Sequence, residues 1–395
     1  MPEPTGDRSR TETESTTPTD VPFSRRRCLE LTGLMLLSGA GVGAASARES
    51  SSASEADDSL TGRPSQRTGA NETSATETSD ASASGPVIGG GEGYEHTVAP
   101  EQADVTVSSR GELESALSSA SSGAVVYVDG DATIDMGGAE WSIPDGVTLA
   151  SNRGIGGAPG GQLSTTDLPW PMFVIGANAR VTGLRVTGQY EEYADLTDGP
   201  VSIGLQAGGT GVEIDNCEVS GFSHAAIRPY TDTHVHHNDV HHNPMDGLGY
   251  GVSVTRGEPL IEYNYFNYNR HSVAGAGGCG YTVRYNHFGP ETVDHVIDQH
   301  KPGGTTMEVH HNTVEAVQHV QDGGATEAVA IRGTPDDVAD IHHNWFYNPT
   351  EPKSSPDGWD GSAITQVHTG AWQNVEYEAN HYGSEEPAED VGAPR

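Results

Sequence analysis

Val235-His-His-Asn238-Asp-Val240 is a six-residue motif that returns four more times before residue 346. Every copy reads apolar, two variable residues, Asn, one variable residue, apolar, and successive copies begin 22 to 32 residues apart. The later copies occupy residues 261–266, 283–288, 309–314 and 341–346. A repeat of this length indicates a solenoid, because one copy is too short to bury a core and the copies must stack.

The motif favours strands rather than helices. It is rich in β-branched and aromatic residues and is bounded by Gly, Asn and Pro, and no unit contains a helix-length pattern. We therefore predict an all-β fold, a parallel β-helix, in which each motif forms part of one coil. The two apolar residues point inward from two strands, and the Asn lies at the corner between them, where it tolerates turn geometry.

Stacking in register makes a second prediction about the Asn residues. Their side chains should lie about 4.8 Å apart and hydrogen-bond from coil to coil. The expected ladder runs from Asn238 to Asn344, with Asn380 as a further member of a weaker last copy. In two earlier copies, at 181–186 and 214–219, Leu184 and Cys217 take the place of the Asn and form an apolar start.

The N-terminal end of the solenoid needs a cover, since a terminal coil otherwise exposes its core and its strand edges. Ser109-Arg-Gly-Glu112 resembles a helix capping box, and apolar residues follow it at helical spacing up to Ala120. A short N-terminal capping helix is therefore expected there. Residues 124–128, 147–149 and 172–175 read as early strands.

The charge balance is strongly acidic. The chain has 56 Asp and Glu against 20 Lys and Arg, a net charge of -36, and its only lysines are Lys301 and Lys353. Such a composition is typical of proteins kept soluble in high salt, where self-repulsion is screened, so we expect a halophilic source. A nucleic-acid partner is not expected, because the basic surface that such partners require is missing.

The N-terminal region resembles a twin-arginine export signal. Ser24-Arg-Arg-Arg-Cys28-Leu29 precedes an apolar run at 31–45 and the small-residue sequence Ala45-Ser-Ala47. The run is too short and too rich in Gly for a stable membrane span, so we predict a secreted protein; an uncleaved membrane anchor is the alternative. The expected divisions are a signal at 1–47, a disordered Ser/Thr/acidic linker at 48–103, the β-helix at 104–383 and a loose acidic tail at 384–395.

The two cysteines that follow the signal are expected to stay unpaired. Cys217 and Cys279 belong to coils three steps apart, roughly 14 Å at sheet spacing, which is beyond disulfide reach. We expect a monomer.

This organisation resembles the pectate-lyase-like superfamily of right-handed parallel β-helix proteins. The resemblance covers residues 104–382 and rests on the capping helix, the segments 147–152 and 181–186, and the Asn-containing coils. It implies one of several chemistries, since that superfamily contains polysaccharide lyases, inverting glycoside hydrolases, esterases, epimerases and non-catalytic adhesins.

Polar residues that recur in every copy are expected from a stacked structural ladder. The His pairs at 236–237, 310–311 and 342–343 belong to this class. A zinc site built from His236, His237, His241 and His242 is an alternative, but neighbouring strand residues point to opposite faces, so all four are not expected to converge.

Polar residues outside the motif are the better candidates for chemistry. Counting back to each Asn places His224, Tyr250, His271 and His295 at matching heights on consecutive coils, and Asp298 and His300 on one strand face. Longer insertions at 313–340 and 345–376 are expected to bound one side of a groove. The predicted catalytic residues are Tyr250, Arg270, His271, His295, His300 and Lys301, and the predicted substrate-binding residues are His224, Arg228, Asp298 and Arg332.

These residue types suit the eliminative cleavage of a uronic-acid glycan. That reaction needs a cation to neutralise the C5 carboxylate, a base for the C5 proton and an acid for the leaving oxygen. The sequence therefore predicts a polysaccharide lyase whose partner is an acidic polysaccharide. The resemblance implies an Arg or Lys base on a strand face, a role that Arg270 or Lys301 resembles, and Ca²⁺ between substrate carboxylates. No calcium-binding motif is present, and Asp294 and Asp298 are the nearest ligands.

Three alternatives stay open. An inverting glycoside hydrolase of polygalacturonase type would need carboxylates about 6.5–9.5 Å apart. A non-catalytic surface or glycan-binding protein would use the β-helix as a rigid spacer. Arg270 and His271 would be purely structural if they only pair with Asp294 and Asp298 between coils.

Overall fold

The computed structural model describes residues 86–194 and 201–395. The chain divides into two units, Met1–Thr78 and Ser79–Arg395, and everything described below belongs to the second. The predicted export signal and most of the predicted linker lie outside the described residues.

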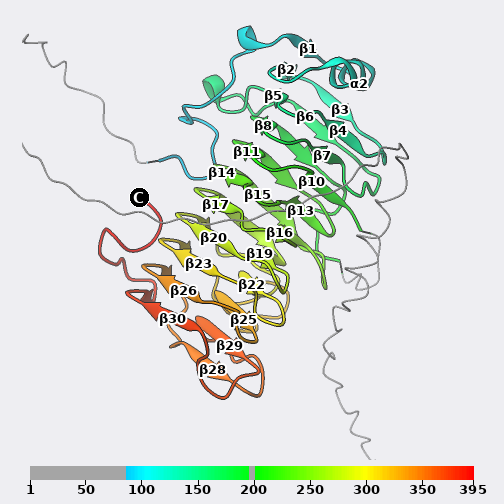
Figure 1. Cartoon of the computed structure of the whole chain (residues 1–395). Coiled ribbons are helices and arrows are strands. Elements are labelled where there is room, and N and C mark those ends of the chain that lie inside the picture. The colour runs from blue at the N-terminus through cyan, green and yellow to red at the C-terminus, as the bar shows by residue number, and fades with distance from the viewer. Residues whose placement is uncertain (1–85, 195–200) are drawn as a thin grey trace, which may run out of the picture. The chain divides into compact units, whose positions relative to one another are not determined.

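The described residues wind into a right-handed parallel β-helix, which confirms the predicted fold class (Figure 1). Coils between the two ends contribute one strand to each of three parallel sheets, named A, B and C here in the order in which a coil enters them; near the C-terminal end, β28 and β29 both belong to sheet C. The early strands expected near residues 125, 148 and 173 are confirmed as β2, β5 and β7.

The three sheets contain the following strands, in their spatial order within the described residues. Sheet A is β1 (Val105–Val107), β2 (Val125–Val128), β5 (Thr148–Ala150), β8 (Arg180–Thr182), β11 (Glu213–Asp215), β14 (His234–His236), β17 (Leu260–Glu262), β20 (Tyr281–Arg284), β23 (Met307–His310), β26 (Ala339–His342) and β30 (Val375–Glu378). Sheet B is β3 (Thr133–Asp135), β6 (Gln162–Ser164), β9 (Arg185–Thr187), β12 (Glu218–Ser220), β15 (Asp239–Asn243), β18 (Tyr265–Asn269), β21 (His287–Phe288), β24 (Thr313–Val314), β27 (Trp345–Phe346) and β31 (His381–Tyr382). Sheet C is β4 (Trp141–Ile143), β7 (Phe173–Ile175), β10 (Ile203–Ala207), β13 (Ala225–Arg228), β16 (Tyr250–Val254), β19 (His271–Gly275), β22 (Ile297–Gln299), β25 (Val329–Arg332), β29 (Ile364–Val367) and β28 (Lys353–Ser355).

The apolar positions of the motif form the inside of the solenoid. Val235 pairs with Ile261 in register, and the same column continues through Val283 to Ile341. The second apolar position stacks likewise, with the Phe266 and Phe288 rings parallel and 5.0 Å apart. Because every coil adds its own apolar residues to the same columns, one continuous core extends from Val107 to Ile364.

The Asn ladder is confirmed, and Asn380 is a full member. The Asn264 Oδ1 accepts hydrogen bonds from the Asn238 backbone N–H at 2.9 Å and from the Asn238 side-chain amide at 3.0 Å. The same pair of bonds is repeated coil by coil to Asn344 and Asn380. Leu184 and Cys217 lie fully buried before the ladder begins.

The corner geometry differs from the expectation in one respect. The left-handed φ falls on the residue before the Asn, as at His237 (53°), Tyr263 (53°) and His311 (54°), and not on the Asn itself. The inward-facing Asn instead provides hydrogen bonds to the backbone of the turn. The left-handed residue keeps its ring outside, where the His237 and Tyr263 rings stack at 5.0 Å.

The predicted capping helix is α2 (Arg110–Ser119). Glu112 accepts the Ser109 N–H at 3.1 Å, as a capping box requires. Leu113 and Leu117 are buried and join the core beside Val107 and Val126, so α2 closes the N-terminal end of the solenoid next to β1 and β2 (Figure 1). Two short 3-10 helices, η2 (Pro100–Gln102) and η3 (Ile155–Gly157), lie in connecting segments.

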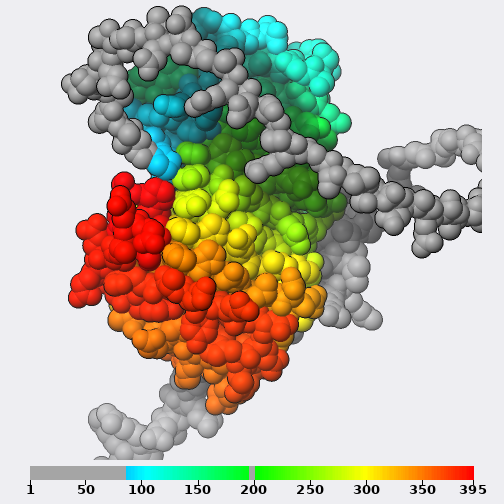
Figure 2. Space-filling view, turned by 60° about the vertical axis from the view of Figure 1, so that its left-hand side comes forward, coloured from blue at the N-terminus to red at the C-terminus, as the bar shows by residue number. Residues whose placement is uncertain are grey.

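Packed chain extends beyond the expected bounds of 104–383 at both ends. In the N-terminal segment, the Gly89 N–H donates to Tyr263 O at 2.9 Å and the Tyr94 hydroxyl donates to Asp215 at 2.8 Å. In the C-terminal segment 384–395, the Gly392 N–H donates to His343 O at 2.9 Å and Ala393 is buried. Figure 2 shows this last segment, in red, against the surface of the yellow and orange coils. The polar composition of both segments hid these contacts, which are made largely by backbone groups.

The cysteines are unpaired, as expected. Cys217 and Cys279 are both free and buried, and burial raises the pKa of each thiol to about 12. None of the helices in the described part of the chain has the length and apolar character to cross a membrane.

Candidate functional site

A column of aromatic rings crosses the coils along sheet C. His224 contacts Tyr250 with ring centroids 5.6 Å apart, Tyr250 stacks on His271 at 5.7 Å, and His271 stacks on His295 at 5.5 Å. Tyr250 pairs in register with His271, whereas its partner on the other side is Ala225, one residue after His224. The structure therefore brings these four predicted residues together, with His224 offset by one position.

A bulge at the start of β19 turns the His271 ring out of the core. The Ser272 and Val273 N–H groups both donate to Val296 O, at 2.9 and 3.1 Å. One extra residue in a strand changes which face the next side chain takes. Val273 is therefore in the core, while His271 lies with Asp298 on the other side of the sheet.

His271 is fully buried and held in one tautomer. Its Nδ1 donates to His295 O at 2.7 Å, because a carbonyl can only accept, and its Nε2 lies 2.8 Å from the Arg270 Nη1. Burial, followed by the positive charge of Arg270, holds the pKa of His271 well below its usual value. His271 is therefore a neutral imidazole whose Nε2 lone pair accepts from Arg270.

Asp298 is the centre of the first charged group. Arg332 donates to it twice, at 2.9 and 2.7 Å, and the His300 Nε2 lies 2.8 Å and the His271 Nε2 3.3 Å from Oδ2. Burial alone would raise the pKa of this carboxyl, but Arg332 and His300 outweigh burial and hold it well below its usual range. Asp298 is thus an ionised group without exposed surface.

A second charged group adjoins it. Asp294 pairs with Arg270 at 2.8 Å, and the His295 Nδ1 lies 2.8 Å from Glu327 Oε2 and 3.4 Å from Asp294 Oδ1. Burial opposes a charge on His295, but Asp294 and Glu327 prevail and raise its pKa. Burial also opposes the charge on Asp294, whose pKa is nevertheless lowered by His295 and Arg270.

Two residues of this site were not predicted. Glu327 is buried and accepts the Gly361 N–H at 2.8 Å, and Trp359 contacts the His295 ring at 4.0 Å and the Arg332 guanidinium at 5.0 Å. Both come from the insertions at 313–340 and 345–376, whose length was the available signal. Trp359 is 38% exposed, so its indole forms part of the solvent-facing rim of the cluster.

Two predicted residues lie apart from the charged groups. Lys301 is exposed just after β22, and none of the ion pairs among the described residues joins it to the cluster; Arg332 occupies the place expected for it. Arg228 lies at the other end of the ring column, 3.1 Å from His224 Nδ1 and 5.0 Å from the centroid of the Trp170 ring.

The residues do not fit calcium. Asp294 and Asp298, the expected ligands, are each already paired with an arginine and at least one histidine. A hard cation would have to displace these positive groups, and no other oxygen-rich cage involves them. We therefore derive no step that uses Ca²⁺.

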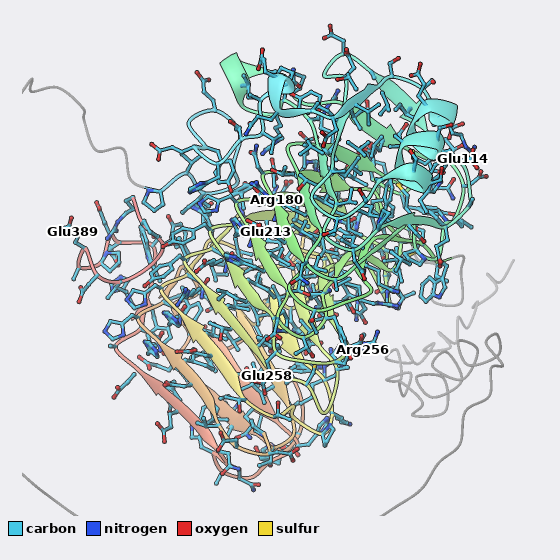
Figure 3. All side chains as sticks on the ribbon, turned by 45° about the horizontal axis from the view of Figure 1, so that its top comes forward. Glu114, Arg180, Glu213, Arg256, Glu258 and Glu389 are labelled. Carbon is cyan, nitrogen blue, oxygen red and sulfur yellow. The ribbon has the colours of Figure 1, made fainter. Side chains whose placement is uncertain are left out.

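Three groups in the described chain bring three potential metal ligands within 4.8 Å of one another. His271, Asp298 and His300 belong to the cluster above, where Arg270 occupies the His271 imidazole and Arg332 the Asp298 carboxylate. In the group of Glu213, Asp215 and His236, Arg180 lies 2.6 Å from Asp215 and beside Glu213 (Figure 3). The third group is His310, His311 and His342.

The four histidines considered for zinc do not form one site. They make two separate pairs, His236 with His237 (Nδ1 atoms 2.9 Å apart) and His241 with His242 (2.8 Å), at the two ends of β15. Within each pair neighbouring residues do converge, because His237 and His242 both have a left-handed φ that interrupts the alternation of strand side chains.

Compared with protein-family models, with curated proteins and with solved structures, the chain matches none of them.

Proposed function

We propose that the protein is a secreted polysaccharide lyase that cleaves an acidic, uronic-acid-containing glycan by β-elimination. The observation that carries the proposal is the cluster around Asp298: two arginines, Arg270 and Arg332, and the imidazole of His300 gather on one side of sheet C in a chain of net charge -36. Each arginine is paired with an aspartate, and Glu327 pairs with His295, so the cluster repels an anionic substrate less than the rest of this acidic chain does and offers it guanidinium and imidazole donors.

His300 is the candidate base. Its side chain is 17% exposed, and the buried Asp298 carboxylate at its Nε2 orients the ring. His271 and His295 have almost no exposed surface, so we assign them to positioning: His271 supports Arg270, and His295 supports Asp294.

The proposed step balances as follows. His300 takes the proton from C5, the electron pair forms the C4–C5 double bond, and the C4–O bond breaks. Arg332, 19% exposed, neutralises the C5 carboxylate and so makes the C5 proton more acidic. The leaving oxygen takes its proton from solvent, because Tyr250 is 3% exposed, as buried as His295, and stacks on His271 as a positioning group.

Hydrolysis fits the cluster less well. An inverting hydrolase needs one protonated carboxylic acid and one carboxylate base across the scissile bond. Asp294 and Asp298 both have lowered pKa values because arginine and histidine charges outweigh their burial. Neither carboxyl is therefore suited to donate a proton near neutral pH.

A non-catalytic glycan-binding protein is the second candidate. The observation in its favour is the exposed Trp359 indole packed on Arg332, which offers a sugar ring an aromatic face beside a cation. A protein of this kind would bind the glycan at the same surface without cleaving it.

The test is an assay on several uronate polysaccharides, including pectate and alginate, at high KCl concentration. The unsaturated product of β-elimination absorbs in the ultraviolet, and His300→Gln should abolish that signal while Lys301→Gln, the matched exposed control, retains it. New reducing ends without ultraviolet absorbance would indicate hydrolysis. Binding without either product would indicate the non-catalytic candidate, and an unchanged rate in His300→Gln would refute the assigned base.

Secretion is tested separately. We expect mass spectrometry of the mature protein from culture medium to show an N-terminus close to residue 48, after the predicted small-residue cleavage site. A chain recovered only from membranes, with residues 1–47 intact, would favour the anchor.

A further inference from the structure

Two consecutive coils carry a histidine pair at the corner between sheets A and B. His310-His311 follows β23 and His342-His343 follows β26, and His310 pairs with His342 in register. Along the described coils this stacking of one pair on another occurs only here. The remaining pair at this corner, His236-His237, is followed in the next coil by Glu262-Tyr263.

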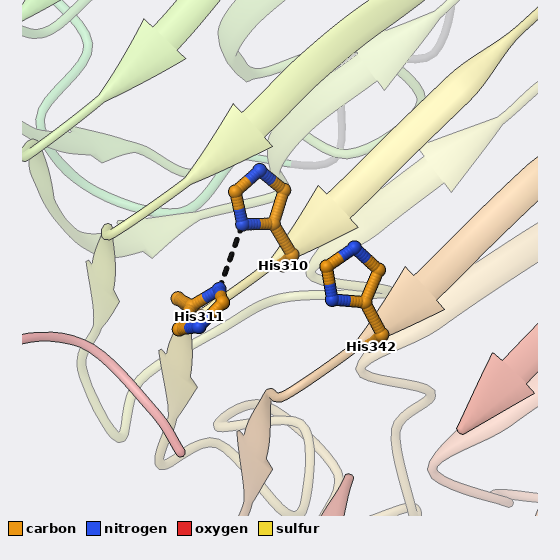
Figure 4. A group of neighbouring side chains, drawn as sticks. All are labelled: His310, His311 and His342. Carbon is orange, nitrogen blue, oxygen red and sulfur yellow. Dashed lines mark hydrogen bonds between the residues drawn. The ribbon is translucent and has the colours of Figure 1, made fainter. Parts of the chain in front are cut away.

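The four imidazoles form a compact array. The Nδ1 atoms of His310 and His311 are 2.8 Å apart, and those of His342 and His343 are 3.0 Å apart. The rings of His310 and His342 stack at 4.9 Å, and those of His311 and His343 at 5.0 Å. Figure 4 shows His310 and His311 facing each other through these nitrogens, with His342 parallel to His310.

The corner itself causes this convergence. Residues i and i+1 of a regular strand point to opposite faces, so two adjacent histidines would normally diverge. The left-handed φ of His311 (54°) and His343 (55°) breaks that rule and brings each ring beside its neighbour. The Asn ladder then fixes the spacing between the two coils, since Asn312 and Asn344 are hydrogen-bonded to each other.

We propose that this array binds one borderline-soft divalent cation of the Zn²⁺ class through His310, His311 and His342, whose ligand nitrogens all lie within 4.8 Å of one another. Tetrahedral ligation at a Zn–N distance of about 2.0–2.1 Å requires ligand atoms about 3.3 Å apart, so small rotations of the rings suffice. Imidazole nitrogens favour zinc, nickel and copper over calcium and magnesium, which prefer oxygen.

One outer partner lies near the array. A metal-bound histidine is usually held through its other ring nitrogen by a carboxylate or carbonyl. The Nε2 of His310 lies 3.8 Å from Glu308 Oε1, beyond hydrogen-bond distance, so a small movement of the Glu308 side chain would let it hold this ring while Nδ1 binds the ion. His310 is largely buried, whereas His311 and His342 are partly exposed, so an ion can reach the site from solvent.

The C-terminal segment supplies a second, independent feature. A cavity of about 540 Å³ is lined by His311 and Tyr285 on the β-helix and by Glu386, Glu389 and Arg395 of the C-terminal segment. The segment is anchored next to the array by the Gly392 N–H, which donates to His343 O, and by the Ala393 N–H, which donates to Thr313 Oγ1 at 2.9 Å. A carboxylate from this acidic segment completes the coordination, and the bound ion ties the segment to the coils.

The binding test uses the full chain without an affinity tag, stripped with a chelator and dialysed into high KCl. Titration with Co²⁺, followed by its visible spectrum, and competition with Zn²⁺ report site geometry and affinity. We expect one ion per chain with a tetrahedral cobalt spectrum, and loss of that site in His310→Gln/His342→Gln. The control, His236→Gln/His237→Gln, removes a pair that has no second pair stacked on it and should bind as the wild type does.

Several results would overturn the proposal. They are the absence of a stoichiometric site in the wild type, equal binding by the His310→Gln/His342→Gln variant, and equal loss in the control. If circular dichroism shows that the double variant has lost its β-sheet, His311→Gln alone carries the test, since it replaces a partly exposed ring. Removing even an outer partner of a metal costs 10–100-fold in affinity, so loss of a ligand should weaken Co²⁺ binding by about 100-fold or more.

Limited proteolysis gives a readout that does not depend on spectroscopy. Zn²⁺ should slow cleavage within residues 384–395 of the wild type and have no effect in His311→Gln. Protection of this segment by Zn²⁺ that is equal in wild type and His311→Gln would contradict the proposed coupling between the ion and the segment.

Discussion

The substitution Asn286→Leu tests whether the Asn ladder stabilises the β-helix. In the native ladder, the Asn286 Oδ1 accepts from the Asn264 backbone N–H at 2.9 Å and from its side-chain amide at 3.0 Å. The Asn286 amide donates to Ile261 O, Arg284 O and Asn312 Oδ1. Leucine has a similar size, so the substitution removes these bonds with little change in volume.

The expected change in the free energy of unfolding follows from the polar groups that stay buried without a hydrogen-bond partner. The Asn264 N–H loses its acceptor, which costs roughly 1–3 kcal/mol, and each of the other hydrogen bonds contributes about 1 kcal/mol net. Burying leucine returns about 2 kcal/mol. With four such bonds, a net loss of about 3–5 kcal/mol results. For roughly 300 residues at about 2 cal/mol/K each, this corresponds to a Tm about 5–8 °C lower.

The assay is thermal unfolding followed by circular dichroism at fixed high KCl. The matched control is Asn267→Ala in the preceding coil, because the Asn267 amide bonds only the exposed Glu291 and its loss should change stability by less than about 0.5 kcal/mol. A Tm for Asn286→Leu within 1 °C of that of the control would refute the view that the ladder stabilises the coils.

Three further predictions concern charge and backbone. Arg332→Gln leaves Asp298 buried without its bidentate partner and should lower the free energy of unfolding by about 3–5 kcal/mol, as measured by chemical denaturation. The double variant Asp298→Asn/Arg332→Gln should recover most of that stability. A double variant no more stable than Arg332→Gln would contradict the pairing. Burial, and after it the neighbouring His236, lowers the pKa of His237 from 6.5 to about 4. Between these two pH values the unfolded chain binds a proton at His237 that the folded chain does not, so the Tm should fall as the pH drops from about 6.5 to 4. His237→Gln should make the Tm depend less on pH in this range. Gly90→Ala should release the N-terminal segment to proteases, because Gly90 has a φ of +67° and an added Cβ would clash with His237 O; unchanged proteolysis would show that the segment stays docked despite this clash.

Residue pattern alone was enough to predict the winding. The recurring apolar positions and Asn238 to Asn344 repeat at solenoid spacing, and a stacked coil is the arrangement that buries all of them together. The capping helix could also be predicted from the sequence, because Ser109 and Glu112 interact within one helical turn. These features depend on local geometry and on periodicity, which a sequence carries directly.

The composition of the candidate site required the tertiary structure. Glu327 and Trp359 reach His295 from later parts of the chain, and Lys301, the nearer neighbour in sequence, lies outside the cluster. Side-chain direction was also decided in three dimensions. A bulge after His271 reverses the strand alternation that counting assumes.

At the ends and corners of the β-helix, some features could also be predicted from the sequence and others could not. The sequence located each corner by its Asn, but the left-handed φ at His311 and His343 is imposed by closure of the coil, and only this closure makes adjacent histidines converge. Likewise, polar segments such as 384–395 carry no hydrophobic pattern, and their docking depends on backbone hydrogen bonds to surfaces that exist only after the coils have stacked. The sequence carries the periodic pattern of buried residues, whereas the contacts between distant coils depend on the register in which those coils stack.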